Sequence, residues 1–267
     1  MKYILSISLS LMISFSAIAQ NDSPYQTSLK ADGPIILGSL GLAALGLNMI
    51  KNKESLTAAE VAGKSPGDVN GFDRFSAGDF SEQADKDSYV PFYASFAAPV
   101  VMLLNKNESK KAGQILVLLT ESMAITGAMF SLTAGSVQRS RPFVYGTAAP
   151  MDKRMDKDSQ RAFYAGHTAA TATATFFLAK VFQDFNPDSK AKPYVWAAAA
   201  LVPASVGYLR LRAGQHFLSD NLLGYALGAG VGIIVPQLHK KGSKSNFSLS
   251  PSVNPDFKGA TMVYRLN

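Results

Sequence analysis

Uncharged stretches alternate with polar segments along the chain. Five of the six stretches are rich in alanine and leucine and long enough to form helices rather than strands. They are residues 33–50, 89–105, 112–138 (interrupted by Glu121), 167–182 (interrupted by Lys180), 193–209 and 221–238. Residues 51–88 are polar and contain many Gly, Asp and Ser residues, which predicts a loop or surface helices. The pattern therefore predicts a mainly helical protein.

The two ends of the chain differ from this pattern. Lys2, an apolar run over residues 3–18 and the sequence Ala17-Ile18-Ala19 predict a secretory signal peptide over residues 1–19, with an uncleaved anchor helix as the alternative. In residues 246–267, apolar and polar side chains alternate around an Asn-Pro-Asp-Phe-Lys-Gly turn, which predicts a short β-hairpin. The helical domain would then occupy residues 20–245.

Composition excludes several classes of protein. The chain has 267 residues, of which 47% are hydrophobic and 17% charged, and it has no cysteine. Clustered apolar residues exclude general disorder, and the lack of cysteine excludes a disulfide scaffold and a thiolate zinc site. The uncharged stretches are close to the ~18–20 residues of a membrane-spanning helix, so spanning helices and buried core helices both remain open.

Lysines are concentrated in three segments. Residues 106–111 contain three lysines, residues 186–192 contain two, and Lys240, Lys241 and Lys244 follow Leu238 closely. The positive-inside rule places these segments in the cytoplasm and residues 51–88, 139–166 and 210–217 in the periplasm. The formal net charge of +7 suits an anionic membrane surface or a phosphate substrate, whereas the scattered basic clusters give little support for nucleic-acid binding.

This topology conflicts with a cleaved signal peptide if residues 33–50 also span the membrane. The cleaved chain would begin outside, whereas six spans would place its start in the cytoplasm. We favour a first segment that packs on the bundle without crossing, which leaves five spans. The alternative is a wholly exported chain whose helices form a globular bundle.

Two of the three histidines lie at the starts of apolar stretches. His216 precedes Asp220 by four residues, and on a helix the carboxylate would orient the imidazole as a nucleophile or base. Arg210 adds a guanidinium suited to phosphate oxygens. His167 follows Gly166, whose lack of a side chain would let a ligand approach the backbone. His239, beside two lysines, is interpreted as a solvated residue.

A further basic cluster ends the third apolar stretch. Arg139 and Arg141 precede Pro142 on the side assigned to the periplasm, where the positive-inside rule does not explain them. We therefore interpret both arginines as candidate functional residues.

The order of these motifs resembles the phosphatidic acid phosphatase type 2 (PAP2) superfamily, whose pattern is Lys-x6-Arg-Pro, Pro-Ser-Gly-His and Ser-Arg-x5-His-x3-Asp. The resemblance covers roughly residues 70–237, and Arg210, His216 and Asp220 have the family spacing. It implies an all-α fold, a PAP2-like helical bundle embedded in the membrane, to which the C-terminal hairpin is added.

The resemblance also implies roles for the site residues. His216 would attack phosphorus to form a phosphohistidine, Asp220 would orient it, and His167 would protonate the leaving oxygen. Arg141 and Arg210 would neutralise the phosphate oxygens. No metal or other cofactor is implied.

Two departures from the family pattern matter for phosphate binding. Ala134 stands where the family has lysine, and Ala165 stands where it has serine. Arg139 or Arg212 would replace the lysine, and the backbone N–H groups of Gly166 and His167 would replace the serine.

The sequence thus predicts a metal-independent phosphatase in the bacterial cell envelope. It would lie in the inner membrane with its site facing the periplasm, or in the periplasm itself. Its substrate would be a phosphorylated lipid or a small phosphomonoester. The alternatives are a vanadate-dependent haloperoxidase and a catalytically degenerate envelope protein that binds phosphorylated lipid or is structural.

Overall fold

In a computed structural model of the chain, residues 23–242, 247–254 and 257–264 are described. The signal peptide expected over residues 1–19 lies outside the described residues. Each apolar stretch forms a long helix: α2 (Leu29–Lys51), α4 (Glu82–Met102), α6 (Ala112–Ser136), α8 (Gly166–Phe185), α9 (Lys192–Arg212) and α10 (Leu218–Leu238). The short helices between them are α3 (Ala58–Ala62), η1 (Pro66–Asp68), η2 (Arg74–Ser76), α5 (Lys106–Ser109), η3 (Pro142–Tyr145), α7 (Met151–Met155) and η4 (Lys157–Gln160).

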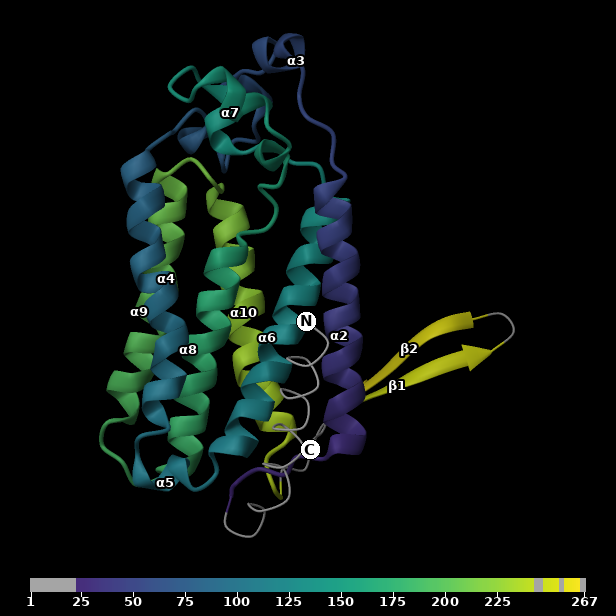
Figure 1. The fold of residues 1–267 in the computed structure, drawn as a ribbon, viewed down its shortest axis with the longest axis vertical. Helices are drawn as coiled ribbons and strands as arrows, with labels where there is room; N and C mark the ends of the chain where they lie inside the picture. Colours follow the sequence, from purple (N-terminus) through teal and green to yellow (C-terminus); the bar gives the residue numbers. More distant parts are fainter. Residues whose placement is uncertain (1–22, 243–246, 255–256, 265–267) are drawn as a thin grey trace, which may run out of the picture.

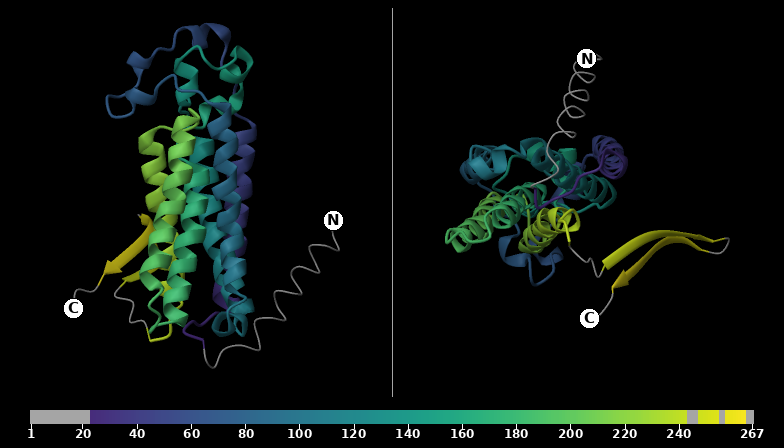
Figure 2. Two further views of the ribbon diagram at one scale, coloured as in Figure 1. Left: turned by 90° about the vertical axis from the view of Figure 1, so that its left-hand side faces the viewer. Right: turned by 90° about the horizontal axis from the view of Figure 1, so that it is seen from below.

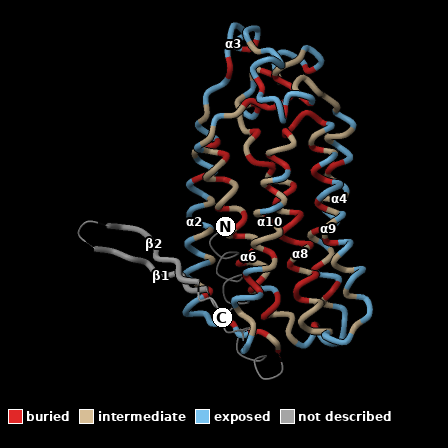
Figure 3. The backbone as a smooth tube through the Cα atoms, turned by 180° about the vertical axis from the view of Figure 1, so that it is seen from behind, coloured by how far each residue is buried: buried red, intermediate tan, exposed pale blue. Residues whose placement is uncertain are grey.

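The long helices form a bundle around α8 (Figure 1). Helix α8 contacts α4, α6, α9 and α10, whereas α2 packs along the outer side of α6. Because α8 is surrounded, most of its alanine and threonine residues are buried (Figure 3).

Close approach of α8 and α10 depends on glycines spaced four residues apart. A side-chain carbon at Gly228 would lie 2.1 Å from the carbonyl oxygen of Ala169, and at Gly232 it would lie 2.6 Å from that of Thr173. Such small-residue contacts are common between helices in membranes, where lipid gives apolar surfaces no reason to associate. Hydrogen bonds such as Thr126–Thr173 (2.8 Å) link neighbouring helices inside the bundle.

The bundle exposes large apolar side chains and buries small or polar ones. Leu37 and Leu45 of α2, Val90 of α4 and Leu201 of α9 are all more than half exposed. By length and composition, α2, α6, α9 and α10 are apolar enough to cross a membrane. An exposed apolar surface of this extent is expected to face lipid rather than water. These features support association of the chain with a membrane.

This set of candidate spans differs from the expected five. It includes α2, which we expected not to cross, and it omits α4 and α8. Helix α4 begins with charged residues, and α8 is rich in threonine and enclosed by other helices, so neither helix matches an isolated apolar span.

The two ends of the bundle have different loops. Segments 51–81 and 137–165, with α3 and α7, cover one end, whereas α5 and the lysine-containing turns lie at the other (Figure 1). At the lysine-rich end, Gln26 N–H donates to the carbonyl of His239 (2.8 Å), and Lys241 N–H donates to that of Pro24 (2.8 Å). The start of α2 is therefore joined to the end of α10.

The C-terminal segment contains two strands, β1 (Phe247–Asn254) and β2 (Phe257–Tyr264). They pair antiparallel, with Phe247 opposite Tyr264 and Asn254 opposite Phe257. The strands lie outside the helical bundle (Figure 2).

Candidate functional site

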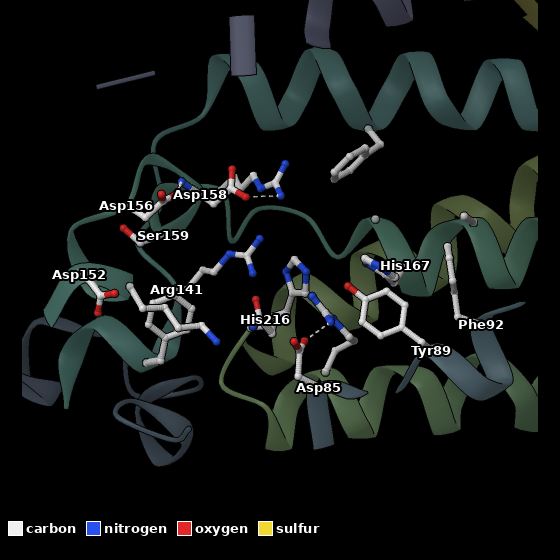
Figure 4. Close-up of a pocket in the computed structure, with 18 residues that line it drawn as sticks. Asp85, Tyr89, Phe92, Arg141, Asp152, Asp156, Asp158, Ser159, His167 and His216 are labelled. Carbon is white, nitrogen blue, oxygen red and sulfur yellow. Dashed lines mark hydrogen bonds and ion pairs between the residues drawn. The ribbon is translucent and has the colours of Figure 1, made fainter. Parts of the chain in front are cut away.

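A cavity of about 740 Å³ opens where the long helices meet segment 137–165. Residues from α4, α6, α8 and α9 and from the loops following α6 and α9 line it. Its basic and imidazole side chains are Arg141, Lys153, Arg161, His167, Arg210 and His216. Figure 4 shows His216 between Arg141 and His167. The structure therefore brings together both predicted histidines and two of the four predicted arginines.

Arg141 is a buried cation in the cavity wall. Its backbone N–H donates to the carbonyl of Ser159 (2.7 Å), and Pro142 then begins η3. Its side-chain Nε is buried without a hydrogen-bond acceptor among the described residues. Burial, followed by the nearby charges of Arg210 and Arg161, lowers the pKa of Arg141 to about 9, so the guanidinium remains charged at neutral pH.

Arg210 lies in the last turn of α9 and has one acidic partner. Its Nη1 donates to Asp85 Oδ1 (2.5 Å) and lies 3.4 Å from Ser88 Oγ, both in α4. Its Nε is buried and, like the Nε of Arg141 and Arg161, has no acceptor among the described residues. Three guanidinium groups thus keep unused donors around one cavity, as expected of a site for an anion rich in oxygen.

His216 is oriented by a backbone carbonyl. A tight turn at Gly214 (φ +69°) precedes it, and its Nδ1 lies 2.6 Å from the carbonyl oxygen of Ala162. Because a carbonyl oxygen only accepts hydrogen bonds, Nδ1 carries the proton and Nε2 keeps its lone pair. Burial and the charges of Arg141 and Arg210 hold the pKa of His216 well below its usual range. The imidazole is therefore neutral at neutral pH.

His167 is the second residue of α8 and lies in an aromatic setting. Its ring is 5.3 Å from that of Tyr89 and 4.5 Å from that of Phe92. Gly166 beside it is required by packing, since a side-chain carbon there would lie 2.6 Å from the Phe130 ring. The N-terminal turn of α8 also directs its positive dipole end towards the cavity.

The predicted hydrogen bond between His216 and Asp220 is not formed. His216 precedes the helix, which begins at Leu218, so the spacing of four residues does not place the two side chains on one helical face. Asp220 Oδ2 instead accepts the backbone N–H of Phe217 (2.9 Å), and Oδ1 accepts from Arg139. Asp220 therefore caps α10 and does not contact the proposed nucleophile.

Two predicted phosphate ligands lie outside the cavity lining. Arg139 pairs with Asp73 (2.7 Å) and Asp220, and its guanidinium lies 4.7 Å from the centre of the Phe217 ring. Arg212 is exposed, two residues beyond Arg210. In this geometry neither arginine is in the position to contact a group in the cavity that the expected replacement of the family lysine requires.

The two alanines that depart from the family pattern also lie outside the cavity lining. Ala134 in α6 and Ala165 before α8 are both completely buried. Arg161 and Lys153 line the cavity instead, and sequence reasoning missed both. The only sequence signal for them is the charge-rich segment 152–161, which follows Arg141-Pro142 closely.

Acidic residues form another part of the cavity wall. Asp152, Asp156 and Asp158 line it together with Lys153 and Arg161, and Asp158 accepts a hydrogen bond from Arg161 (2.8 Å). The cavity wall therefore combines cations beside His216 with carboxylates, three in the segment 152–158 and one, Asp85, that pairs with Arg210 near His216 (Figure 4).

These features define a class of protein: a membrane-associated helical bundle with a cationic site beside two histidines. Residues 115–244 match the sequence profile of the PAP2 superfamily, and the chain belongs to that superfamily.

The search of curated proteins finds no match. Among solved structures, the chain is similar to a transmembrane PAP2-type phosphatidylglycerolphosphate phosphatase from Bacillus subtilis. The two are 18% identical with a TM-score of 0.44, and the match covers 76% of this chain and 93% of the other. At that TM-score, the likeness carries no argument about this chain.

Proposed function

We propose that the chain is a metal-independent phosphatase that hydrolyses a phosphate monoester or diphosphate of a lipid. One observation carries the proposal: among the described residues, buried donors of Arg141, Arg161 and Arg210 are left without acceptors around the cavity that contains His216. Phosphoryl transfer depends mainly on positioning and on positive charge around the transferring group. Members of the PAP2 superfamily are phosphatases, and this site has the charge that such chemistry requires.

His216 is the proposed nucleophile. Its Nε2 lone pair attacks phosphorus, the bond between phosphorus and the ester oxygen breaks, and His167 donates a proton to the leaving oxygen. The ring carries a positive charge in the resulting phosphohistidine, and the carbonyl of Ala162 stabilises it through the Nδ1 proton. Water then attacks phosphorus and gives a proton to His167 while the bond between phosphorus and nitrogen breaks, which releases phosphate, restores the neutral imidazole of His216 and returns His167 to its protonated form.

Arg161 takes the part of the family lysine in this proposal. It is the guanidinium in the cavity wall that the sequence pattern did not predict, and among the described residues it pairs with one carboxylate, whereas Arg139 pairs with two. The backbone N–H groups of Gly166 and His167 supply donors where Ala165 lacks a hydroxyl group.

The position of the cavity supports the proposal of a lipid substrate and a periplasmic site. It opens at the end of a bundle whose sides expose apolar residues, where the phosphates of one leaflet would lie if the bundle spans the membrane. The lysine-rich turns lie at the opposite end, and the positive-inside rule assigns that end to the cytoplasm of a bacterial cell. The domain from residue 20 to 245 would thus belong to the inner membrane.

A second candidate function is binding of phosphorylated lipid without hydrolysis. Ala134 and Ala165 favour it. So does the fact that, among the described residues, the His216 ring is hydrogen-bonded to the carbonyl of Ala162 and to no carboxylate. Both candidates predict binding of phosphate, and only the enzyme predicts its release.

Phosphate release by the purified full chain from phosphatidic acid, an isoprenyl diphosphate and a lipid A phosphate tests the proposal. His216→Ala should abolish release and also the phosphorylated protein trapped by alkaline quenching. Equal release by wild type and His216→Ala would contradict catalysis by His216. Binding of these lipids without release by wild type would favour the second candidate.

Two arginines on one helix give a matched pair for the phosphate site. Arg210→Ala should lower kcat/KM by about 10²–10³-fold, the usual cost of losing one charge-stabilising donor. Arg212→Ala should leave kcat/KM within about twofold, because Arg212 lies outside the cavity lining. Equal losses in both variants would mean that general positive charge, rather than the cavity, governs activity.

A further inference from the structure

The end of the bundle opposite the cavity contains a second cluster of titratable groups. Asp32 in the first turn of α2, Glu121 in α6 and His239 at the end of α10 meet there. His239 was interpreted as solvated, and the structure corrects this: its side chain is only 14% exposed because the start of α2 covers it. The proposed phosphatase does not use this cluster.

The ligand atoms of the cluster converge on one point. His239 Nε2 lies 3.2 Å from Asp32 Oδ1 and 3.6 Å from Glu121 Oε2, and the three atoms all lie within 4.8 Å of one another. Ligand atoms held about 2.1 Å from a tetrahedral metal ion lie about 3.4 Å apart. The two distances to His239 therefore agree with a shared ion.

The tautomer of His239 determines which of its ring atoms faces the two carboxylates. Its Nδ1 lies 2.8 Å from the carbonyl oxygen of Val235, so Nδ1 carries the proton in a neutral ring. The lone pair on Nε2 then faces two carboxylate oxygens, which repel it. A cation bound between the three atoms removes this repulsion.

An independent observation concerns Glu121. The residue is 3% exposed, and its Oε2 is buried without a hydrogen-bond donor among the described residues, although it faces His239. A buried carboxylate oxygen without a partner is costly and calls for a counter-ion. The nearby ammonium groups of Lys180 and Lys240 are paired with Asp184 instead.

We propose that Asp32, Glu121 and His239 bind one divalent transition-metal ion of the Zn²⁺ type. One imidazole nitrogen and two carboxylate oxygens suit such an ion and balance its double charge. The ion joins α2, α6 and α10 at the lysine-rich end and is structural, since the cluster lies at the opposite end from the cavity.

Metal titration of the purified full chain in detergent tests this site. After treatment with a chelator and its removal, Zn²⁺ binding is measured by elemental analysis, and Co²⁺ serves as a spectroscopic probe of a nitrogen–oxygen ligand set. We expect one ion per chain, with an affinity at least tenfold lower in Glu121→Gln and in His239→Gln. Added Zn²⁺ should raise the Tm of wild type, and a chelator should lower it.

Glu108→Gln is the matched control. Glu108 is also a buried glutamate at the lysine-rich end with an unpartnered Oε2, but its Oε1 accepts from Asn186 (2.6 Å) and it lies outside the cluster. Its affinity for Zn²⁺ should stay within twofold of wild type. An equal loss in this variant, or no saturable binding by wild type, would overturn the proposal and leave a proton on His239 as the shared cation. If the variants fail to fold, the wild-type Tm still tests the proposal. A lower Tm after chelator treatment supports the metal site, and an unchanged Tm contradicts it.

Discussion

Arg139 joins segments that are far apart in the chain. Its guanidinium pairs with Asp73 before η2 and with Asp220 in the first turn of α10, and both carboxylates are almost completely buried. Ser219 Oγ also donates to Asp73 (2.6 Å). This network fixes the start of α10, and with it the loop that holds His216.

Replacement of Arg139 should therefore affect stability before it affects chemistry. Arg139→Ala leaves two buried carboxylates without a cation and should lower the free energy of unfolding by about 3 kcal/mol. Exposed Arg212→Ala should change it by less than about 0.5 kcal/mol. Denaturant unfolding in detergent measures both. A stable Arg139→Ala variant that has lost activity would instead indicate contact between Arg139 and the substrate.

His216 should make stability depend on pH. Because the folded-state pKa lies below the unfolded value of about 6.5, the unfolded chain binds an additional proton below that pH. As the pH falls below about 6.5, wild type should therefore lose up to about 1.4 kcal/mol per pH unit more than His216→Gln, which lacks this contribution. The lowered pKa of Asp73 acts in a separate window, below about pH 4, in both proteins. Parallel unfolding curves from pH 7 to 5 would show that His216 is not held neutral.

The sequence pattern predicted which residues line the cavity better than it predicted the contacts that these residues make. Arg141, His167, Arg210 and His216 line it as a group because each adjoins an end of a long helix. The partners of Asp220 were not predictable from spacing, since they depend on where α10 begins and on Asp73, which lies far away in the sequence. Long side chains from the charged 152–161 segment gave no periodic signal, so Arg161 was missed.

At the level of helices, apolar runs predicted each long element, but the boundaries needed polar signals. Helix α4 begins at Glu82, seven residues before the apolar run at 89–105, because Ser81 Oγ caps it by accepting from Ala84 N–H (3.2 Å). Because residues 82–88 include several charged side chains, the sequence pattern places them in the polar segment 51–88 rather than in the helix. The membership of α8 in the core was likewise hidden, because alanine and threonine do not report which face they occupy.

Contact between α8 and α10 can be tested with two glycines on one helix. Gly228→Ala would place a methyl group on the carbonyl of Ala169 and should cost about 1–3 kcal/mol of stability by overpacking. Gly230→Ala meets no atom within 4 Å and should be neutral or slightly stabilising, since alanine favours helices. Thermal unfolding in detergent compares them. Equal Tm values for both variants would mean that the helices are not in close contact.

At the scale of the whole molecule, the orientation of the bundle in the membrane decides between two expectations from the sequence. One is a cleaved signal peptide, and the other is a cytoplasmic position of the lysine-rich turns. The first described residues lie at the lysine-rich end, opposite the cavity. If the long helices cross the membrane, a signal peptide that delivers residue 20 to the outside puts the cavity inside. The positive-inside rule requires the reverse.

Single cysteines can report this orientation, because the native chain has none. Ala62→Cys lies exposed in α3 at the cavity end, and Asp188→Cys lies exposed at the other end. We expect an impermeant maleimide to label Ala62→Cys in intact cells and Asp188→Cys only after permeabilisation. The reverse pattern would place the cavity in the cytoplasm and agree with a cleaved signal peptide.

The junction between Pro24–Gln26 and His239–Lys241 has a consequence for biosynthesis. The segment before α2, the first long helix of the described residues, is hydrogen-bonded to the end of α10. In a nascent chain these two hydrogen bonds cannot form until residue 241 has emerged, whereas Gln114 of α6 and Asp184 of α8, which also bind Tyr25, emerge earlier. The junction is therefore among the last contacts of the bundle to form, and a chain truncated within α10 lacks it.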